Sequence, residues 1–252
     1  MTNPFRIGAR GSPLSVAQTR RVQAMLARTA GLSPDEFPIH TMTTTGDRIQ
    51  DRTLLEAGGK GLFTKELDDA LLDGRIDLGV HSLKDLPTKL PDGIVLACVP
   101  EREDPRDALI AKTAARLEDL PAGAVLGTAS LRRQAQALHL RPDLHIVTLR
   151  GNVDTRIAKL EAGAVAATFL ALAGLKRLGL ESRASGVIDP EIMPPAVGQG
   201  ALAITARAGD ARVLDMLAKS EDQEARLAIE AERGLLEALD GSCRTPIAAY
   251  AQ

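Results

Sequence analysis

The feature that most constrains the fold is an alternation of short apolar strands and amphipathic helices. In the middle of the chain the predicted strands cover residues 108–111, 124–128, 145–149 and 166–172, and the predicted helices cover residues 131–140 and 153–162. Strands and helices that alternate at this spacing are typical of parallel sheets with helices packed on their faces. The chain is therefore expected to have an α/β fold.

A second series of the same kind occupies the first hundred residues. Ser12 and Pro13 are residue types preferred at the N-cap and first position of a helix, so a helix is expected to follow the first strand. Further strands are expected at 39–45, 76–81, 94–99 and in the sequence GQGALAITAR, and further helices at 62–72 and 220–239. With 252 residues the chain exceeds one typical domain, and candidate boundaries are the proline-broken segment 101–107 and Pro194–Pro195.

Two of the strand-to-helix junctions carry a concentration of arginine. GTASLRRQAQAL contains Arg132 and Arg133, and IVTLRGNVDTRIAKL contains Arg150 and Arg156. Such junctions lie at the carboxyl edge of a sheet, where backbone N–H groups and the helix dipole favour anions. Because guanidinium is a fixed bidentate donor for carboxylate or phosphate, these arginines predict a ligand with several negative charges.

Polar groups follow the strands of the first half as well. They are Arg10 and Ser12, Thr45 and Asp47, and Ser82, Lys84 and Asp85, matched in the second half by Thr128, Ser130 and Asn152. Any single arginine at such a position is more often a solvated charge at a helix end. The same clustering in both halves, however, favours a ligand cleft between two α/β lobes.

Asp85 is a carboxylate among cations. A structural salt bridge would explain it, and the alternative is proton transfer or the stabilisation of a cation that develops on an anionic substrate. The neighbouring Lys84 would hold Asp85 in its ionised form.

The two cysteines differ in their surroundings. Cys243 follows a helix end at Asp240–Gly241 and stands beside Arg244. A lone cysteine is more commonly a buried, unreactive group, but a position on a turn beside a cation favours the thiolate. Cys98 lies within an apolar strand and fits the buried case.

Composition and motifs argue against several other classes. Aromatic residues make up only 2% of the chain and the formal net charge is −2, which argues against nucleic-acid binding and general polyanion binding. The histidines and cysteines show no metal-ligand spacing, and no GxxxxGK[ST] or GxGxxG motif follows a strand. The start lacks an apolar signal segment and the longest apolar run, 164–175, is too short to span a bilayer. A cytoplasmic protein without membrane contact is therefore expected.

Taken together, residues Arg10 to Tyr250 resemble the hydroxymethylbilane synthase (porphobilinogen deaminase) family of heme and porphyrin biosynthesis. The motifs that carry the resemblance are RGSPLSVAQ, GGKGLFTKE, HSLKDLP, EREDPRDA, GTxSLRRQ, LRGNVxTR, AGLKRLG, PAVGQGAL and DGSCRTPI. The resemblance implies a transferase that removes ammonia from porphobilinogen and joins the rings stepwise into the linear tetrapyrrole hydroxymethylbilane. It also implies a dipyrromethane cofactor tethered through a thioether to the matching cysteine, Cys243.

The resemblance implies residue roles as well. Asp85 matches the catalytic aspartate, which contacts pyrrole N–H groups, stabilises cationic intermediates and assists proton transfer. The positions that match cofactor-binding residues are Lys84, Asp85, Ser130, Arg132, Arg133, Arg156 and Cys243. The positions assigned to substrate binding are Arg10, Ser12, Gln18, Thr128, Arg150, Arg177 and Gln199. Lys60 and Phe63 are expected near the cleft on a lid, and no metal is implied.

The family's fold implies two lobes of the periplasmic-binding-protein type around a central cleft, with a small third α/β domain. The corresponding boundaries are 1–100 with 197–218 for the first lobe, 101–196 for the second, and 219–252 for a third domain that is expected to be truncated. Ala129 stands where the family usually has a second serine, but Thr128 and Ser130 remain for anion binding. A monomer is expected. The alternatives are a non-catalytic two-lobed carboxylate-binding protein and an inactive, truncated form of the enzyme.

Overall fold

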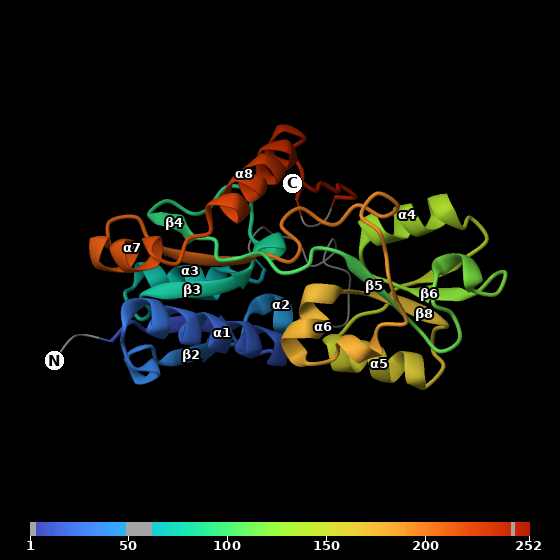
Figure 1. Ribbon diagram of the computed structural model, residues 1–252, viewed down its shortest axis with the longest axis horizontal. Coiled ribbons are helices and arrows are strands. Elements are labelled where there is room, and N and C mark those ends of the chain that lie inside the picture. Colours follow the sequence, from blue (N-terminus) through green and yellow to red (C-terminus); the bar gives the residue numbers. More distant parts are fainter. Residues whose placement is uncertain (1–3, 49–61, 243–244) are drawn as a thin grey trace.

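The computed structural model describes residues 4–48, 62–242 and 245–252. They form two lobes, each built on one five-stranded sheet, that lie side by side along the long axis of the molecule (Figure 1). Helix α8 (Gln223–Ala238) lies over the first lobe, near its junction with the second. The predicted α/β architecture with two lobes is confirmed.

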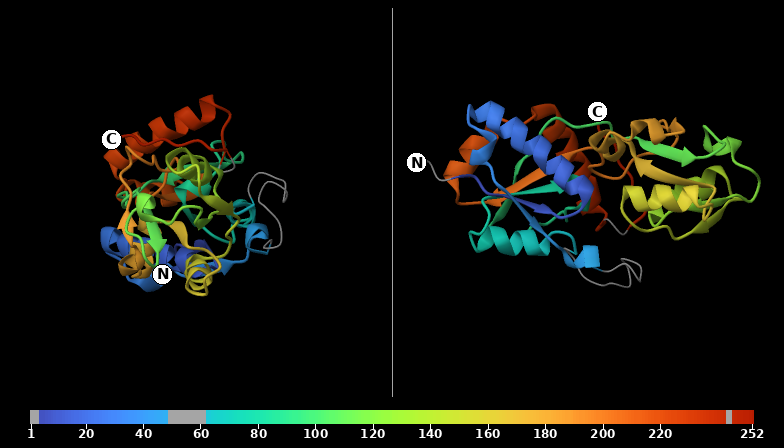
Figure 2. Two further views of the ribbon diagram at one scale, coloured as in Figure 1. Left: turned by 90° about the vertical axis from the view of Figure 1, so that its right-hand side faces the viewer. Right: turned by 90° about the horizontal axis from the view of Figure 1, so that it is seen from below.

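The first sheet has the strand order β2-β1-β3-β10-β4. Its strands are β1 (Ile7–Arg10), β2 (Ile39–Met42), β3 (Leu78–Ser82), β4 (Ile94–Cys98) and β10 (Leu202–Arg207). Its helices are α1 (Pro13–Ala30), α2 (Thr45–Arg48), α3 (Lys65–Leu72) and α7 (Ala211–Ala218). Helices α1 and α7 cover one face of the sheet, with Val22 and Leu217 in the core beneath them, and α3 covers the other face (Figure 2).

The second sheet has the strand order β7-β6-β8-β5-β9. Its strands are β5 (Asp107–Ala111), β6 (Val125–Gly127), β7 (His145–Val147), β8 (Ala167–Ala171) and β9 (Gly186–Val187). Its helices are α4 (Leu131–Leu140), α5 (Val153–Glu161) and α6 (Leu172–Leu178). Ala137 of α4 packs with Leu126 and Phe169, whereas α5 and α6 pack in a separate core that contains Ile110.

Both sheets are mixed, although the alternation of strands and helices predicts parallel ones. Strand β1 is parallel to β2 and β3, and β6 is parallel to β7 and β8. Strands β5 and β10, in contrast, run antiparallel to both of their neighbours. Each of them is the first strand after the chain crosses from one lobe to the other, so it enters its sheet at the junction, where β1 and β3 end. The crossings therefore set the direction of these two strands.

The two crossings, residues 99–106 and 194–201, lie against each other. The Glu103 N–H donates to Gly200 O at 3.3 Å, and Arg102 Nε donates to Gln199 O at 3.0 Å. The lobes also meet where Gly174 of α6 faces α1, because a Cβ atom at Gly174 would lie 3.7 Å from the side chain of Leu14. The lobes are thus joined by a pair of hydrogen-bonded segments and by one contact between helices.

A buried carboxylate holds α8 on the crossings. Glu232 is 2% exposed, and its carboxylate accepts from Arg102 Nη1 at 2.7 Å. It also accepts from the backbone N–H groups of Gly198, at 2.7 Å, and Ala251, at 3.0 Å. Both crossings and the last described residues therefore depend on one side chain of α8.

The apolar residues of α8 fall into two groups. Ile229 and Leu236 are buried, whereas Leu227 and Leu235 are 66% and 45% exposed, as is Leu239 just after the helix at 57%. The helix therefore packs on one side and presents apolar side chains on the other, while the three domain boundaries given above stay predictions. Within the described residues, no helix combines the length and the apolar character that crossing a membrane requires.

Candidate active site at the junction of the lobes

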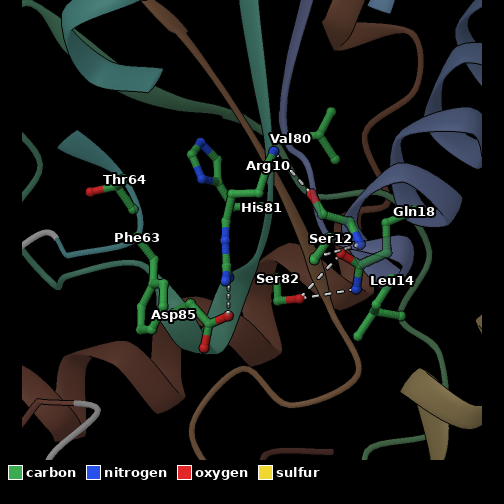
Figure 3. Close-up of a pocket in the computed structure, with 11 residues that line it drawn as sticks. Arg10, Ser12, Leu14, Gln18, Phe63, Thr64, Val80, His81, Ser82 and Asp85 are labelled. Carbon is green, nitrogen blue, oxygen red and sulfur yellow. Dashed lines mark hydrogen bonds and ion pairs between the residues drawn. The ribbon is translucent and has the colours of Figure 1, made fainter. Parts of the chain in front are cut away.

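Several predicted site residues gather where β1 and β3 end, and they line a pocket (Figure 3). Strand β1 ends at Arg10, and Ser12 and Gln18 belong to the cap and first turns of α1. Strand β3 ends at Ser82 and continues into a short 3-10 turn whose last residue is Asp85. The structure therefore brings these five residues to one place.

Arg10 lies between Asp85 and the ring of Phe63. Its Nη1 lies 3.9 Å from Asp85 Oδ2, and its Cζ lies 4.3 Å from the centre of the Phe63 ring, in cation–π contact. The side chains of Arg10 and Asp85 are 22% and 33% exposed, so both can be reached from the pocket. At 3.9 Å the two charges attract without a direct hydrogen bond, and a bound molecule can hydrogen-bond to either group.

Hydrogen bonds within the chain hold the wall of this pocket. Ser12 caps α1, because its Oγ accepts from the Ser15 N–H at 3.3 Å, and Ser15 Oγ accepts from the Arg10 N–H at 3.1 Å. Gln18 is 3% exposed, and its Nε2 donates to Ser82 Oγ at 3.0 Å. These bonds fix the backbone from which Arg10 projects.

His81 adjoins the pocket as a buried group. It is 6% exposed, and its Nε2 lies 3.0 Å from Thr205 Oγ1. Burial, together with the charge of Arg10, lowers the pKa of His81 to about 4, so the imidazole is neutral at physiological pH.

The protein should become less stable as the pH falls from 6.5 towards 4. In this range the unfolded chain, with an ordinary histidine pKa, binds a proton that folded His81 does not bind, so stability rises with pH. Between pH 7 and pH 4.5 the loss due to His81 is about 2 kcal/mol. Urea unfolding at both pH values should show a loss that is smaller by about this amount in His81→Gln. Equal losses in parent and variant would contradict a neutral buried histidine.

A second cluster lies in the other lobe, at the start of α4. Arg132 and Arg133 are 4% and 6% exposed, and the Nη2 of each lies 2.7 Å from one oxygen of Asp107. Arg132 Nη1 also donates to Pro194 O at 2.8 Å, and Arg133 Nη1 donates to Phe169 O at 3.0 Å. Although burial acts to raise it, the charges of Arg133 and Arg132 lower the pKa of Asp107 to about 2. Two cations and one anion are thus fixed together in the interior.

Thr128, Ser130 and Asn152 satisfy backbone groups at the helix starts. Ser130 Oγ accepts from the Arg133 N–H at 3.4 Å, and Thr128 Oγ1 accepts from the Ser130 N–H at 3.1 Å. Asn152 Oδ1 accepts from the Thr155 N–H at 2.8 Å. These oxygens therefore cap α4 and α5, and their contact with a bound anion stays a prediction.

Lys84 connects the two clusters. Its Nζ lies 3.4 Å from Gln199 Oε1, and Gln199 Nε2 donates to Asp107 Oδ1 at 2.9 Å. Burial, together with the charge of Arg133, lowers the pKa of Lys84 to about 8. Because Lys84 comes from the first lobe and Arg133 from the second, the cationic site spans both lobes.

Arg156 belongs to the same electrostatic site. Burial, followed by the charges of Arg133 and Arg150, lowers its pKa to about 10, while the charge of Asp85 acts to raise it. The charge of Arg133 thus acts on both Lys84 and Arg156, and the charge of Asp85 favours the protonated form of both.

Three residues that the family motifs assign to the site are not shown in the pocket or among the cations around Asp107. Arg177 lies on α6, where it donates to Gly200 O of the second crossing, and burial lowers its pKa to about 10. Lys60 and Cys243 lie outside the residues that the structure describes.

The described residues on either side of positions 243 and 244 are hydrogen-bonded to each other. The Gly241 N–H also donates to Leu236 O at 2.8 Å, which holds Gly241 against the end of α8. The Ser242 N–H donates to Thr245 Oγ1 at 2.9 Å, and the Thr245 N–H donates to Ser242 O at 3.0 Å. The positions that flank Cys243 and Arg244 are therefore held close together.

The sequence analysis did not single out Asp107, although it stands in the motif EREDPRDA. It is the first residue of β5 and is completely buried. A lone acid at the start of an apolar strand is a usable signal, because a buried carboxylate requires cationic or hydrogen-bonding partners.

The chain is a two-lobed α/β protein with a cationic site at the junction of its lobes. The crystal structure of the methionine-binding protein MetQ matches with a TM-score of 0.53 at 14% identity, over 99% of both chains. A putative methionine-binding lipoprotein from Bacillus subtilis matches with a TM-score of 0.51 at 14% identity, over 92% of this chain and 96% of its own. This likeness concerns the fold alone.

The chain belongs to the porphobilinogen deaminase family. The family's dipyrromethane cofactor binding domain matches residues 5–215, and its C-terminal domain matches residues 226–252. The porphobilinogen deaminase of Caulobacter sp. (strain K31) is 60% identical over 99% of this chain and 80% of its own length. That of Phenylobacterium zucineum (strain HLK1) is 57% identical over 98% of this chain and 79% of its own length.

Proposed function

We propose that this protein is a transferase that deaminates porphobilinogen and joins it stepwise to a dipyrromethane on Cys243, giving the linear tetrapyrrole hydroxymethylbilane. The observation that carries the proposal is the position of Asp85 beside cations from both lobes, in a chain of this family. The cations are complementary in charge to the acetate and propionate groups of the substrate. The carboxylate of Asp85 is complementary to the positive charge that develops on the pyrrole ring.

The described residues fit the dipyrromethane cofactor. Each of its rings carries acetate and propionate groups, and the cations proposed to bind them are Lys84, Arg132, Arg133 and Arg156. The Nε of Arg132 is buried without a hydrogen-bond partner among the described residues, which leaves a donor for a carboxylate. When bound, the dipyrromethane would supply the free pyrrole α-carbon to which the first new ring is joined, and each added ring would supply the same carbon to the next.

The pocket residues act on the porphobilinogen ring. Arg10 binds a substrate carboxylate from its position between Phe63 and Asp85. When ammonia leaves, positive charge spreads over the pyrrole, and the fixed carboxylate of Asp85 lowers the energy of that charge. The same carboxylate accepts a hydrogen bond from the pyrrole N–H and receives the proton that the ring carbon loses after the new bond has formed.

The remaining residue roles follow the positions of the family motifs. We assign Ser130 to cofactor binding, and Lys60 and Phe63 to a lid over the cleft. The residues assigned to substrate binding besides Arg10 are Ser12, Gln18, Thr128, Arg150, Arg177 and Gln199. The domain boundaries given by the resemblance, a cytoplasmic location and a monomeric state belong to the same proposal. The site is built from both lobes of a single chain, which supports the monomer.

Intact-protein mass spectrometry tests the covalent tether. After incubation with porphobilinogen, the parent chain should carry an adduct of two pyrrole units, and Cys243→Ser should carry none. Cys98→Ser is the matched control, because Cys98 is buried, and burial together with Glu221 raises the pKa of its thiol to about 12. This variant should be modified like the parent.

The same experiment separates the proposal from its alternatives. A non-catalytic carboxylate-binding protein would bind porphobilinogen, remain unmodified and release no ammonia. An inactive form would fold without either modification or turnover. Either result in the folded parent would contradict the proposed function.

A further inference from the structure

Asp107 is the most deeply enclosed charged group of the cationic site, and the family reading assigns it no role. Its side chain is completely buried at the start of β5, directly after the first crossing between the lobes. Its Oδ2 accepts from Arg132 Nη2 at 2.7 Å, and its Oδ1 accepts from Arg133 Nη2 at 2.7 Å and from Gln199 Nε2 at 2.9 Å. Both oxygens of the carboxylate are therefore in use.

The contacts of Asp107 bring together two arginine side chains that leave α4 in different directions. Arg132 and Arg133 are consecutive residues of α4, and consecutive side chains of a helix point about 100° apart. The carboxylate of Asp107 brings both guanidinium groups together, each on a different oxygen. It also offsets the repulsion between two like charges in the interior, where such repulsion is weakly screened.

Further contacts remove the remaining freedom of the two arginines. Arg132 Nη1 donates to Pro194 O of the second crossing, and Arg133 Nη1 donates to Phe169 O of β8. Gln199 extends the network into the first lobe, because its Oε1 lies 3.4 Å from Lys84 Nζ. One carboxylate thus connects cations from both lobes.

We propose that Asp107 is a positioning residue that holds Arg132, Arg133 and, through Gln199, Lys84 in a pre-formed anion site for the cofactor. The inference rests on the proposed function, since it names what the site binds. Asp107 needs no contact with the cofactor. It acts because cations that are already fixed lose little conformational freedom when the carboxylates of the cofactor arrive.

The test is the rate at which the apoprotein acquires the covalent adduct, measured by time-resolved intact mass after porphobilinogen is added. Asp107→Asn keeps the shape of the side chain and removes its charge, and it should slow this step by at least about tenfold. Asp77→Asn is the matched control, because Asp77 is 3% exposed and pairs with Arg6 at 2.9 Å and Arg207 at 3.2 Å, before the start of β3 and away from the site. It should lower the melting temperature and load the cofactor at the parental rate.

The possible results separate positioning from a purely structural role. Loading of folded Asp107→Asn within about twofold of the parent would overturn the inference, and a similar slowing in Asp77→Asn would do the same. If Asp107→Asn does not fold, Asp107→Glu takes its place, because it keeps the charge and displaces the carboxylate by one methylene group. Slow loading of this variant supports the inference and parental loading overturns it. A parent that never loads would instead contradict the proposed function.

Discussion

Asp85→Asn is expected to fold like the parent and to form tetrapyrrole about 10²- to 10³-fold more slowly. The amide keeps the size of the side chain, but it has neither the charge proposed to stabilise a cationic pyrrole nor the basicity proposed to accept a proton. The fold should tolerate the change because Asp85 is 33% exposed and its ion pair with Arg10 is 3.9 Å long. Steady-state rates of tetrapyrrole formation measure the first effect, and thermal unfolding measures the second.

Asp92→Asn is the control for charge. Asp92 is exposed on the surface after the same 3-10 turn, and its substitution changes the net charge by the same amount. Its turnover and melting temperature should both match those of the parent. Turnover of Asp85→Asn within about tenfold of the parent would reassign Asp85 to a structural ion pair with Arg10.

Gly200→Ala is expected to reduce the free energy of unfolding by about 3 kcal/mol. Gly200 has a φ of +89°, which side-chain-bearing residues rarely adopt, and a Cβ atom there would lie 2.2 Å from Glu103 O. The obstacle is backbone, and it cannot move aside easily because the Glu103 N–H is bonded to Gly200 O. Since Gln199 and the first crossing must shift together, the loading of the cofactor should slow as well.

Gly209→Ala provides the comparison, because Gly209 follows the far end of β10 and a Cβ atom there would have nothing within 4 Å. Urea unfolding should place this variant within about 0.5 kcal/mol of the parent. Equal stability of Gly200→Ala and Gly209→Ala would contradict this prediction, because it would mean that the backbone of the crossings shifts at little cost in free energy.

Local signals predicted most of the elements. Ser12 and Pro13 mark the start of α1, and the apolar period after Ser130 gives α4 its observed bounds. The period of a buried strand is the same in either direction, however, so it could not show that β5 and β10 are antiparallel. The predicted strand 166–172 extends one residue into α6, because Leu172 is as buried as the strand before it, and neither α6 nor α7 was predicted as a helix.

The site residues also fall into those that local sequence predicts and those that it does not. Residue type and position at strand ends predicted Arg10, Lys84 and Asp85, because such ends share one edge of a sheet. Asp107 carries a local signal, an acid at the start of an apolar strand, but its partners could not be predicted from it. Arg132 lies on α4 and Gln199 in the second crossing, so these contacts form only when distant segments pack together. No short segment of sequence encodes such packing.

The residues after α8 return to this helix and to the crossings. The Ser242 N–H donates to Thr245 Oγ1, and the Thr245 N–H donates to Ser242 O. Further along, the Ala249 N–H donates to Pro195 O of the second crossing, and the Ala251 N–H donates to Glu232 of α8. The end of the described chain therefore serves as a clasp between α8 and the second crossing, so a substitution at Glu232 should loosen both.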